Sequence, residues 1–190
     1  FGAFANSGQI CMSTERIIVD EAIADVFVAK LAARAVGLPL GDPRKGPVVL
    51  GSVVDMATVE RCNGLIDDAL ALGATLVCGG KSDSTLMSAT LLDRVTPAMR
   101  IYHEESFGPV IPIVRATAEE YALLLANDNP YALSVALFTR DPELLAIVDY
   151  ARSLPIDIVM INTNGVRLAK DRRLLEDLAA RRDRLEIYLQ

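Results

Sequence analysis

The sequence has 190 residues, of which 52% are apolar and 23% charged, a composition typical of a compact globular domain. Its net charge of −6 and isoelectric point near 4.8 argue against binding to nucleic acid or to an acidic membrane surface, because like charges repel. No apolar run approaches the roughly 20 residues that span a bilayer, so a membrane protein is not expected.

The first half of the chain alternates between strand-like and helix-like patterns. β-Branched runs predict strands, apolar residues at helical spacing predict helices, and prolines and glycines mark the loops. The predicted elements are a strand over 16–20, a helix over 21–37, a loop over 38–47, a helix over 54–72 that ends at Gly73, and extended stretches over 76–78 and 89–95.

The same alternation continues in the second half. It predicts a strand over 110–114, a helix over 119–127, a strand over 133–138, a helix over 142–153 and a strand over 156–161. Strands that alternate with helices are joined by right-handed crossovers, which cover both faces of a mostly parallel sheet. The predicted fold is therefore α/β, a three-layer α/β/α sandwich.

Residues 167–190 differ from the rest of the chain. Their charged residues surround a leucine stripe, which predicts an amphipathic helix; the stripe consists of Leu168, Leu175, Leu178 and Leu185. A solvated helix that packs by its leucine face is the plain interpretation. An altered terminus and a partner-binding helix stay open as alternatives.

Cys11 lies just after a glycine turn and just before an apolar strand. A thiol at such a junction can be presented to a substrate, whereas Cys62 and Cys78 lie within apolar patterns and are expected to fill the core. A space-filling role stays open for Cys11 as well. The three cysteines form no CxxC or metal spacing, which favours a reducing cytoplasm. His103 is the single histidine, so no site with two histidine ligands exists and no metal is expected.

Four segments resemble one enzyme family. The run Phe4-x-Asn6-x-Gly8-Gln9-x-Cys11 resembles the active-site cysteine signature of NAD(P)-dependent aldehyde dehydrogenases, and Glu104-Glu105-Ser106-Phe107-Gly108-Pro109-Val110 resembles their cofactor-facing Glu-x-Phe-Gly-Pro segment. Ala126–Ser134 is similar to an Asn-x-x-x-Tyr-Gly-Leu stretch, and Ile161-Asn162 to a later strand end. The resemblance covers residues 1 to about 164. Residues 8–16 are most similar to members that oxidise vanillin, salicylaldehyde or benzaldehyde.

The resemblance implies that the Cys11 thiolate attacks an aldehyde, giving a thiohemiacetal that passes hydride to NAD or NADP and leaves a thioester for water. It implies that the Cys11 amide donates to the oxyanion, that Glu105 binds the nicotinamide ribose and that Phe107 packs beside the nicotinamide. For Asn6, a loop-capping role is at least as well supported as catalysis. The implied partner is a small aldehyde, and a homo-oligomer is left open.

The sequence departs from the family pattern in several places. The family's general base and dinucleotide-binding domain precede the nucleophile, and no Gly-x-Gly-x-x-Gly turn occurs in this chain, which starts at Phe1. We therefore expect a fragment that lacks the dinucleotide-binding domain and binds the cofactor poorly. Ala132 stands where the family has glycine. The family's Phe-Gly-Gly-x-Lys-x-Ser-Gly stretch is missing, which predicts a domain over 1–164 and an atypical charged helical tail over 165–190.

Two other functions are compatible with these residues. In one, the domain folds but acts only as a scaffold, and Glu104-Glu105 is a solvated acidic turn. In the other, Cys11 is acylated and turns over slowly, so the chain is a weak esterase without a redox step.

Overall fold

The computed structural model describes residues 2–131, 133, 135–138, 148–149, 152, 159–163, 171–183 and 185–189. The chain divides into two compact units, residues 1–132 and residues 133–190, each with its own sheet. The first unit contains the segments that form the candidate site.

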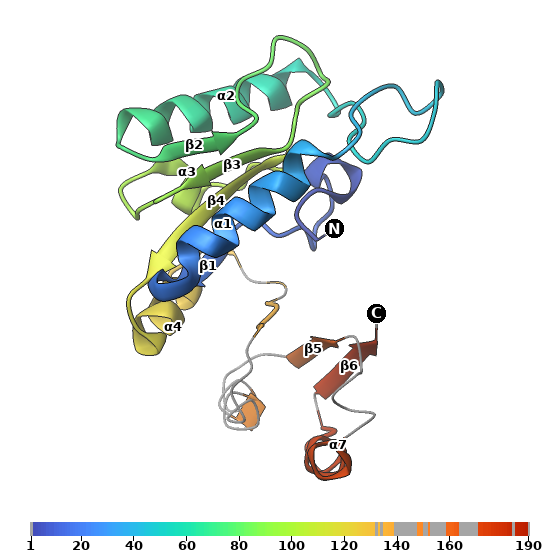
Figure 1. The fold of residues 1–190 in the computed structure, drawn as a ribbon, viewed down its shortest axis with the longest axis vertical. Coiled ribbons are helices and arrows are strands. Elements are labelled where there is room, and N and C mark those ends of the chain that lie inside the picture. The colour runs from blue at the N-terminus through green and yellow to red at the C-terminus, as the bar shows by residue number, and fades with distance from the viewer. Residues whose placement is uncertain are drawn as a thin grey trace. The chain divides into compact units, whose positions relative to one another are not determined.

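The first unit is built on a four-stranded sheet in the order β1-β4-β3-β2 (Figure 1). The strands are β1 (Ile17–Asp20), β2 (Thr75–Cys78), β3 (Thr90–Asp93) and β4 (Val110–Ala116). Strand β4 is parallel to both β1 and β3, whereas β2 is antiparallel to β3. The predicted mostly parallel sheet is confirmed.

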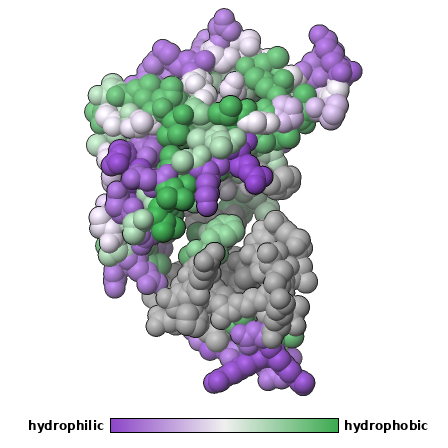
Figure 2. Space-filling model, in the orientation of Figure 1, coloured by the Kyte–Doolittle hydropathy of each residue, from purple (hydrophilic) through white to green (hydrophobic). Residues whose placement is uncertain are grey.

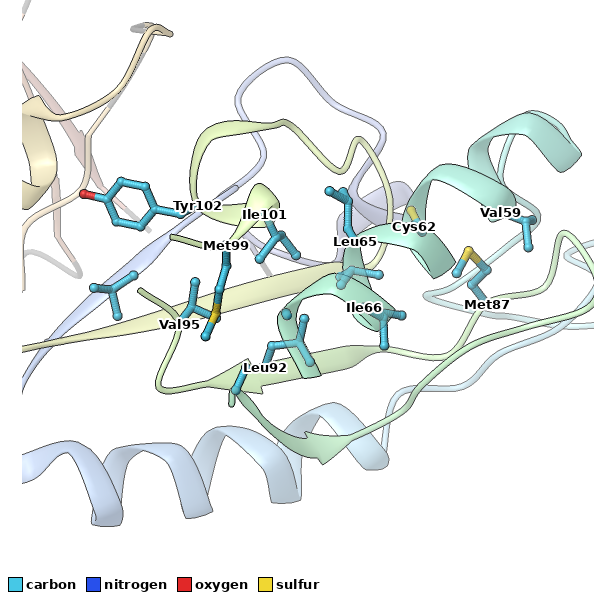
Figure 3. Packing of buried hydrophobic residues seen from close by; sticks show 14 of the residues in the cluster. Val59, Cys62, Leu65, Ile66, Met87, Leu92, Val95, Met99, Ile101 and Tyr102 are labelled. Carbon is cyan, nitrogen blue, oxygen red and sulfur yellow. The ribbon is translucent and has the colours of Figure 1, made fainter. Parts of the chain in front are cut away.

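Helices cover both faces of this sheet. Helix α1 (Glu21–Val36) packs on one face, and α2 (Met56–Ala71), α3 (Arg100–His103) and α4 (Glu119–Asn127) contribute to the core on the other (Figures 1 and 3). Alternate residues of β4 point into different cores because side chains alternate along a strand. Ile111 and Ile113 face α1, while Val110 and Val114 belong to the core with α2. This is the three-layer sandwich that the sequence predicts.

The two long helices begin at capping aspartates. The Asp20 carboxylate accepts a hydrogen bond from the amide of Ala22 at 2.8 Å, and the Asp55 carboxylate accepts one from the amide of Thr58 at 2.8 Å. Each satisfies an amide that has no partner within its helix. The cap on Asp20 fixes the point at which β1 turns directly into α1.

Strand β4 changes partners at Pro112. It pairs with β3 through residues 110–112 and with β1 through residues 113–116. Proline has no N–H to donate and is unusual in a central strand. Here it lies just before the β1 ladder begins at Ile113, so the missing donor removes no bond from that ladder.

The second unit holds a two-stranded parallel sheet. Its elements are β5 (Val159–Thr163), α7 (Arg172–Ala179) and β6 (Leu185–Leu189). Helix α7 begins at Asp171, which accepts a hydrogen bond from the amide of Leu174 at 3.0 Å. Among the residues described in either unit, no helix is long and apolar enough to cross a bilayer.

Two predictions for the second unit need correction. Of the helix expected over 167–190, the described residues 171–183 and 185–189 are helical only in α7, where Leu174 and Leu178 are buried and Leu175 is half-exposed. The tail ends in the strand β6, because its Leu-Glu-Ile-Tyr-Leu run suits pairing with β5. The strand predicted over 133–138 is also wrong where the structure describes it, since residues 133 and 135–138 have no strand partner and Phe138 is 85% exposed.

The remaining predictions for this unit are only partly described. Val148, Asp149 and Arg152 are helical within the helix predicted over 142–153, and the other residues of that segment lie outside the described ones. The strand predicted over 156–161 starts outside the described residues and is observed as β5.

Candidate functional site

Cys11 lies at the tip of an exposed turn. The amide of Ser13 donates to the carbonyl of Ile10 at 2.8 Å, which closes the turn around Cys11 and Met12. The Cys11 side chain is exposed, and Ile10 and Met12 beside it are 39% and 56% exposed. The predicted exposed position of Cys11 is confirmed.

The turn is preceded by a short 3₁₀ segment, Ala5–Gly8, with an unusual backbone. Asn6, Ser7 and Gly8 have φ values of 51°, 56° and 77°, all in the left-handed region. Non-glycine residues enter this region only when surrounding contacts hold them there. Asn6 donates from its side-chain amide to the carbonyl of Gln9 at 3.2 Å, which matches the loop-capping interpretation.

The side chains of Gln9 and Ser7 attach this loop to residues 51–54. The Gln9 side chain accepts from the amide of Val54 at 2.8 Å and donates to the carbonyl of Ser52 at 3.3 Å. The Ser7 hydroxyl donates to the carbonyl of Gly51 at 3.0 Å. The cysteine loop is thus held by polar contacts more than 40 residues away in sequence.

The second predicted segment, residues 105–108, is anchored by a fully buried serine. The Ser106 carbonyl accepts from Arg61 at 3.1 Å and from the Cys62 thiol at 3.6 Å, both on α2. The Ser106 hydroxyl also bonds with the backbone of Gly108. Phe107 has a φ of 44° and its side chain is 38% exposed, while Glu105 is partly exposed.

Glu15 joins the two segments. Its carboxylate accepts hydrogen bonds from the amide of Ser106 at 2.9 Å and from the amide of Phe107 at 3.1 Å. Burial raises the pKa of Glu15 above its ordinary value, against the opposing effect of these two donors. The residue that follows the cysteine turn thus holds the backbone of the predicted cofactor segment.

Arg16 makes the corresponding connection to a third segment. Its guanidinium donates to the carbonyls of Tyr102, Leu125 and Asp128 and lies 3.9 Å from the centre of the Tyr102 ring. The Tyr102 hydroxyl donates to the Asp128 carboxylate at 3.0 Å, and burial raises the pKa of Tyr102 to about 12. Arg16 therefore ties the cysteine loop to the Asn127-Asp128 stretch.

Gly8 and Gly108 bring the cysteine loop and the 105–108 segment together backbone to backbone. A Cβ atom built on Gly8 would lie 2.2 Å from the carbonyl oxygen of Gly108. A Cβ atom on Gly108 would lie 2.6 Å from the Cys62 sulfur. Two predicted motifs almost 100 residues apart are therefore in direct contact. The side chains of Cys11, Glu105 and Phe107 take no part in this contact.

The other candidate residues have plain structural environments. His103 is exposed and its ring bonds to the carbonyl of Pro97 at 2.9 Å, as expected for a turn histidine. Cys62 is fully buried and Cys78 partly buried, as predicted (Figure 3). In the described part of the chain, no group of three or more His, Cys, Asp or Glu side chains is placed to hold a metal ion.

The three thiols should react with iodoacetamide at very different rates. We expect Cys11 to be labelled first because it is exposed, Cys78 next and Cys62 last. Burial raises the pKa of Cys62 to about 11, so at about pH 8 only about one Cys62 in a thousand is thiolate. Peptide mass mapping over time measures the order, and labelling of Cys62 as fast as Cys11 in the folded chain would contradict the buried environment.

The sequence analysis missed the contacts of Gln9, Glu15, Arg16 and Ser106. One signal was visible: a Glu-Arg pair directly before an apolar strand is an unusual place for two charges, because both must find partners there. Their partners could not be found, since Glu15 and Ser106 are separated by 91 positions.

Comparison with known proteins bears on the same residues. The sequence model of the aldehyde dehydrogenase family matches residues 1–171. A vanillin dehydrogenase of Pseudomonas fluorescens is 54% identical over 141 residues, which cover 74% of this chain and 29% of that protein.

Solved structures also resemble the chain. A salicylaldehyde dehydrogenase from Pseudomonas putida G7, complexed with salicylaldehyde, matches with a TM-score of 0.79 at 44% identity over 85% of this chain and 33% of that one. An NADP-dependent glyceraldehyde-3-phosphate dehydrogenase from Bacillus halodurans C-125, complexed with NADP, gives a TM-score of 0.77 at 39% identity over 84% and 33%. The chain thus spans about a third of the length of these relatives.

Proposed function

Since this chain belongs to the aldehyde dehydrogenase family, we propose that it takes part in oxidising an aromatic aldehyde to a carboxylic acid with NAD or NADP, and that Cys11 is the nucleophile. The exposed Cys11 turn, held directly against the 105–108 segment through Gly8 and Gly108, is the observation that carries this proposal. The backbone contact between the loop that carries Cys11 and the segment proposed to meet the cofactor supports the proposal.

In the proposed reaction, the Cys11 sulfur forms a bond to the aldehyde carbon and the carbonyl oxygen becomes an oxyanion. The Cys11 backbone amide is the donor we assign to that oxyanion. Loss of hydride from the same carbon leaves a thioester on Cys11. Water then cleaves the carbon–sulfur bond, which releases the acid and restores the thiol.

Glu105 and Phe107 fit one end of a nicotinamide cofactor. Glu105 is a partly exposed carboxylate suited to accepting bonds from ribose hydroxyls, and Phe107 offers an exposed ring two residues away. The cofactor, when bound, would accept the hydride. Because the 190 residues contain no Gly-x-Gly-x-x-Gly turn, we propose that the remainder of the cofactor is held by residues outside this sequence.

An aromatic substrate is supported by two observations. The vanillin and salicylaldehyde dehydrogenases are among the most similar relatives. In addition, Ile10 and Met12 flank Cys11 and are partly exposed, which provides apolar contact area for an aromatic ring.

The wider properties of the protein also remain proposals. All three cysteines are free, which supports a reducing, cytoplasmic location. We also propose a homo-oligomer, supported by the apolar side chains of Ile23 and Val26 on α1, which are 57% and 60% exposed. Figure 2 shows charged side chains interspersed with the apolar ones on the face of the first unit that it draws. We propose a domain over 1–164 with a tail over 165–190, although the tail is only partly helical.

Acyl transfer to Cys11 tests the function directly. The chain is incubated with benzaldehyde, salicylaldehyde or vanillin and either NAD or NADP; the acid is quantified and acid-quenched peptides are mapped for acylated cysteine. A nitrophenyl benzoate serves as an acyl donor that needs no cofactor. Acid together with acylated Cys11 supports the dehydrogenase. Acylation by the ester alone supports the esterase, and no acylation supports the scaffold.

A further inference from the structure

The Glu15 carboxylate holds two consecutive backbone amides of the segment that carries Glu105 and Phe107. We propose that Glu15 is a positioning residue, which fixes the backbone between Glu105 and Phe107 and thereby sets how both side chains meet the nicotinamide end of the cofactor. This inference rests on the proposed function and deepens it. Glu15 itself touches neither the substrate nor the reacting atoms.

The geometry of the segment supports this role. Phe107 is held in the left-handed region at a φ of 44°, a strained conformation that a non-glycine residue keeps only where its surroundings impose it. One oxygen of Glu15 holds the Ser106 amide and the other holds the Phe107 amide, so the peptide between them cannot rotate without breaking a bond. Glu15 is therefore placed to impose the strained turn.

The opposite side of the same peptide is anchored to α2. Arg61 and the Cys62 thiol donate to the Ser106 carbonyl, while Glu15 accepts from the Phe107 amide of that peptide. The segment is thus held between α2 and Glu15, which lies just before β1. A substitution of Glu15 removes the hydrogen bonds that Glu15 accepts and leaves those from α2 in place. Its structural effect should therefore be confined to residues 105–108.

The energetics argue against a role in stability. Burial raises the pKa of Glu15, and the nearby Glu105 raises it further. A carboxyl group whose pKa is raised by folding lowers the stability of the fold once the pH exceeds its ordinary pKa, because ionising it is harder in the folded state. Above the ordinary pKa of a glutamate, the raised pKa of Glu15 therefore lowers the stability of the fold, and the hydrogen bonds from the Ser106 and Phe107 amides offset only part of that effect.

The test compares Glu15→Gln with Glu104→Gln in the full 190-residue chain. Glu104 undergoes the same chemical change nearby, but its carboxylate pairs with Arg100 and contacts neither amide. In glutamine one of the two carboxylate oxygens is replaced by an NH2 group, which donates and does not accept, so the two amides that Glu15 holds on separate oxygens cannot both keep their partner. Glu15→Asp serves as a second variant, which keeps the charge but shortens the reach of the carboxylate.

Amide hydrogen exchange by NMR gives the first readout. We expect Glu15→Gln to unfold at the same temperature as the wild type or higher, while its Ser106 and Phe107 amides exchange at least about tenfold faster, as the loss of a charged hydrogen bond predicts. Amides in the sheet, such as Leu92 and Val114, and all amides of Glu104→Gln should be unchanged. Unchanged Ser106 and Phe107 exchange, or faster exchange throughout the sheet, would overturn the proposal.

Saturation transfer from the protein to the nicotinamide protons of NAD gives the second readout. We expect the signal to fall at least about threefold in Glu15→Gln and to persist in Glu104→Gln, while Cys11 alkylates at the wild-type rate in both. If Glu15→Gln and the wild type gave equal signals, the positioning role of Glu15 would be overturned, and the proposed cofactor role of Glu105 and Phe107 would stand. No signal in the wild type would instead overturn the proposed cofactor role of Glu105 and Phe107, and this inference with it.

Discussion

Replacing Cys11 with serine is expected to lower both the acylation of residue 11 and the formation of acid by at least about 1,000-fold. A serine hydroxyl is not ionised near neutral pH, whereas the thiolate of a cysteine is accessible near neutral pH and is a strong nucleophile. The change is nearly isosteric on an exposed turn, so the fold should be unaffected. Acid release and peptide mapping with an aldehyde and either cofactor measure the loss.

The matched control is Cys78→Ser. The Cys78 thiol is partly buried and contacts the carbonyl of Ala89, a contact that a serine hydroxyl can keep. We expect acid formation within about twofold of the wild type, the range of substitutions that alter no important contact. If Cys11→Ser formed acid as fast as this control, Cys11 would not be the nucleophile.

Replacing Gly8 with alanine is expected to lower the free energy of unfolding of the first unit by about 3–5 kcal/mol. Alanine at a φ of 77° costs about 1–2 kcal/mol, and overpacking a close contact costs about 1–3 kcal/mol. The upper end applies because the new Cβ atom would meet the Gly108 carbonyl at 2.2 Å, and backbone cannot turn aside as a side chain can. Urea unfolding followed by circular dichroism measures the change.

Alanine substitutions at two other glycines distinguish backbone strain from steric overlap as the cause of that loss of stability. Gly73 has a φ of 99° but no atom within 4 Å of an added Cβ, so Gly73→Ala reports backbone strain alone. Gly46 has open space and no positive φ, and Gly46→Ala should be neutral or stabilising by up to about 1 kcal/mol. A Gly8→Ala effect no larger than that of Gly73→Ala would mean that the contact with Gly108 is not close.

Local signals in the sequence were sufficient for the four strands and for helices α1, α2 and α4 of the first unit, whereas α3 and the 3₁₀ segment Ala5–Gly8 were not predicted. Asp20 and Asp55 precede apolar helical patterns and cap α1 and α2, and the run Val110–Val114 is buried on both faces as a central strand. Each of these features depends on neighbours within a few residues, which a sequence displays directly.

The candidate site was predictable only in part, because its parts meet through long-range backbone contacts. The exposure of Cys11 follows from the turn that carries it. The contacts of Glu15 with Ser106 and of Gly8 with Gly108 join residues about 90 to 100 positions apart, and two of those four partners have no side chain to carry a pattern. The prediction for the tail was wrong for another reason. Its leucines have helical spacing, but residues Leu185–Leu189 form a strand that pairs with β5, and this pairing overrides the local helical pattern.

The change of partners at Pro112 has a consequence for how the protein opens. Strand β1 is attached to residues 113–116 of β4, whereas β3 is attached to residues 110–112, and no residue of β4 belongs to both ladders. The two ladders are nevertheless joined at Ile113, whose carbonyl accepts a hydrogen bond from the amide of Val95 at 3.0 Å, and Val19 and Leu91 share one hydrophobic core with Ile113. We therefore expect Ile17–Asp20 and Thr90–Leu92 to lose hydrogen-exchange protection together. The turn that carries Cys11 precedes β1 in the chain, so its opening should be coupled to the same event.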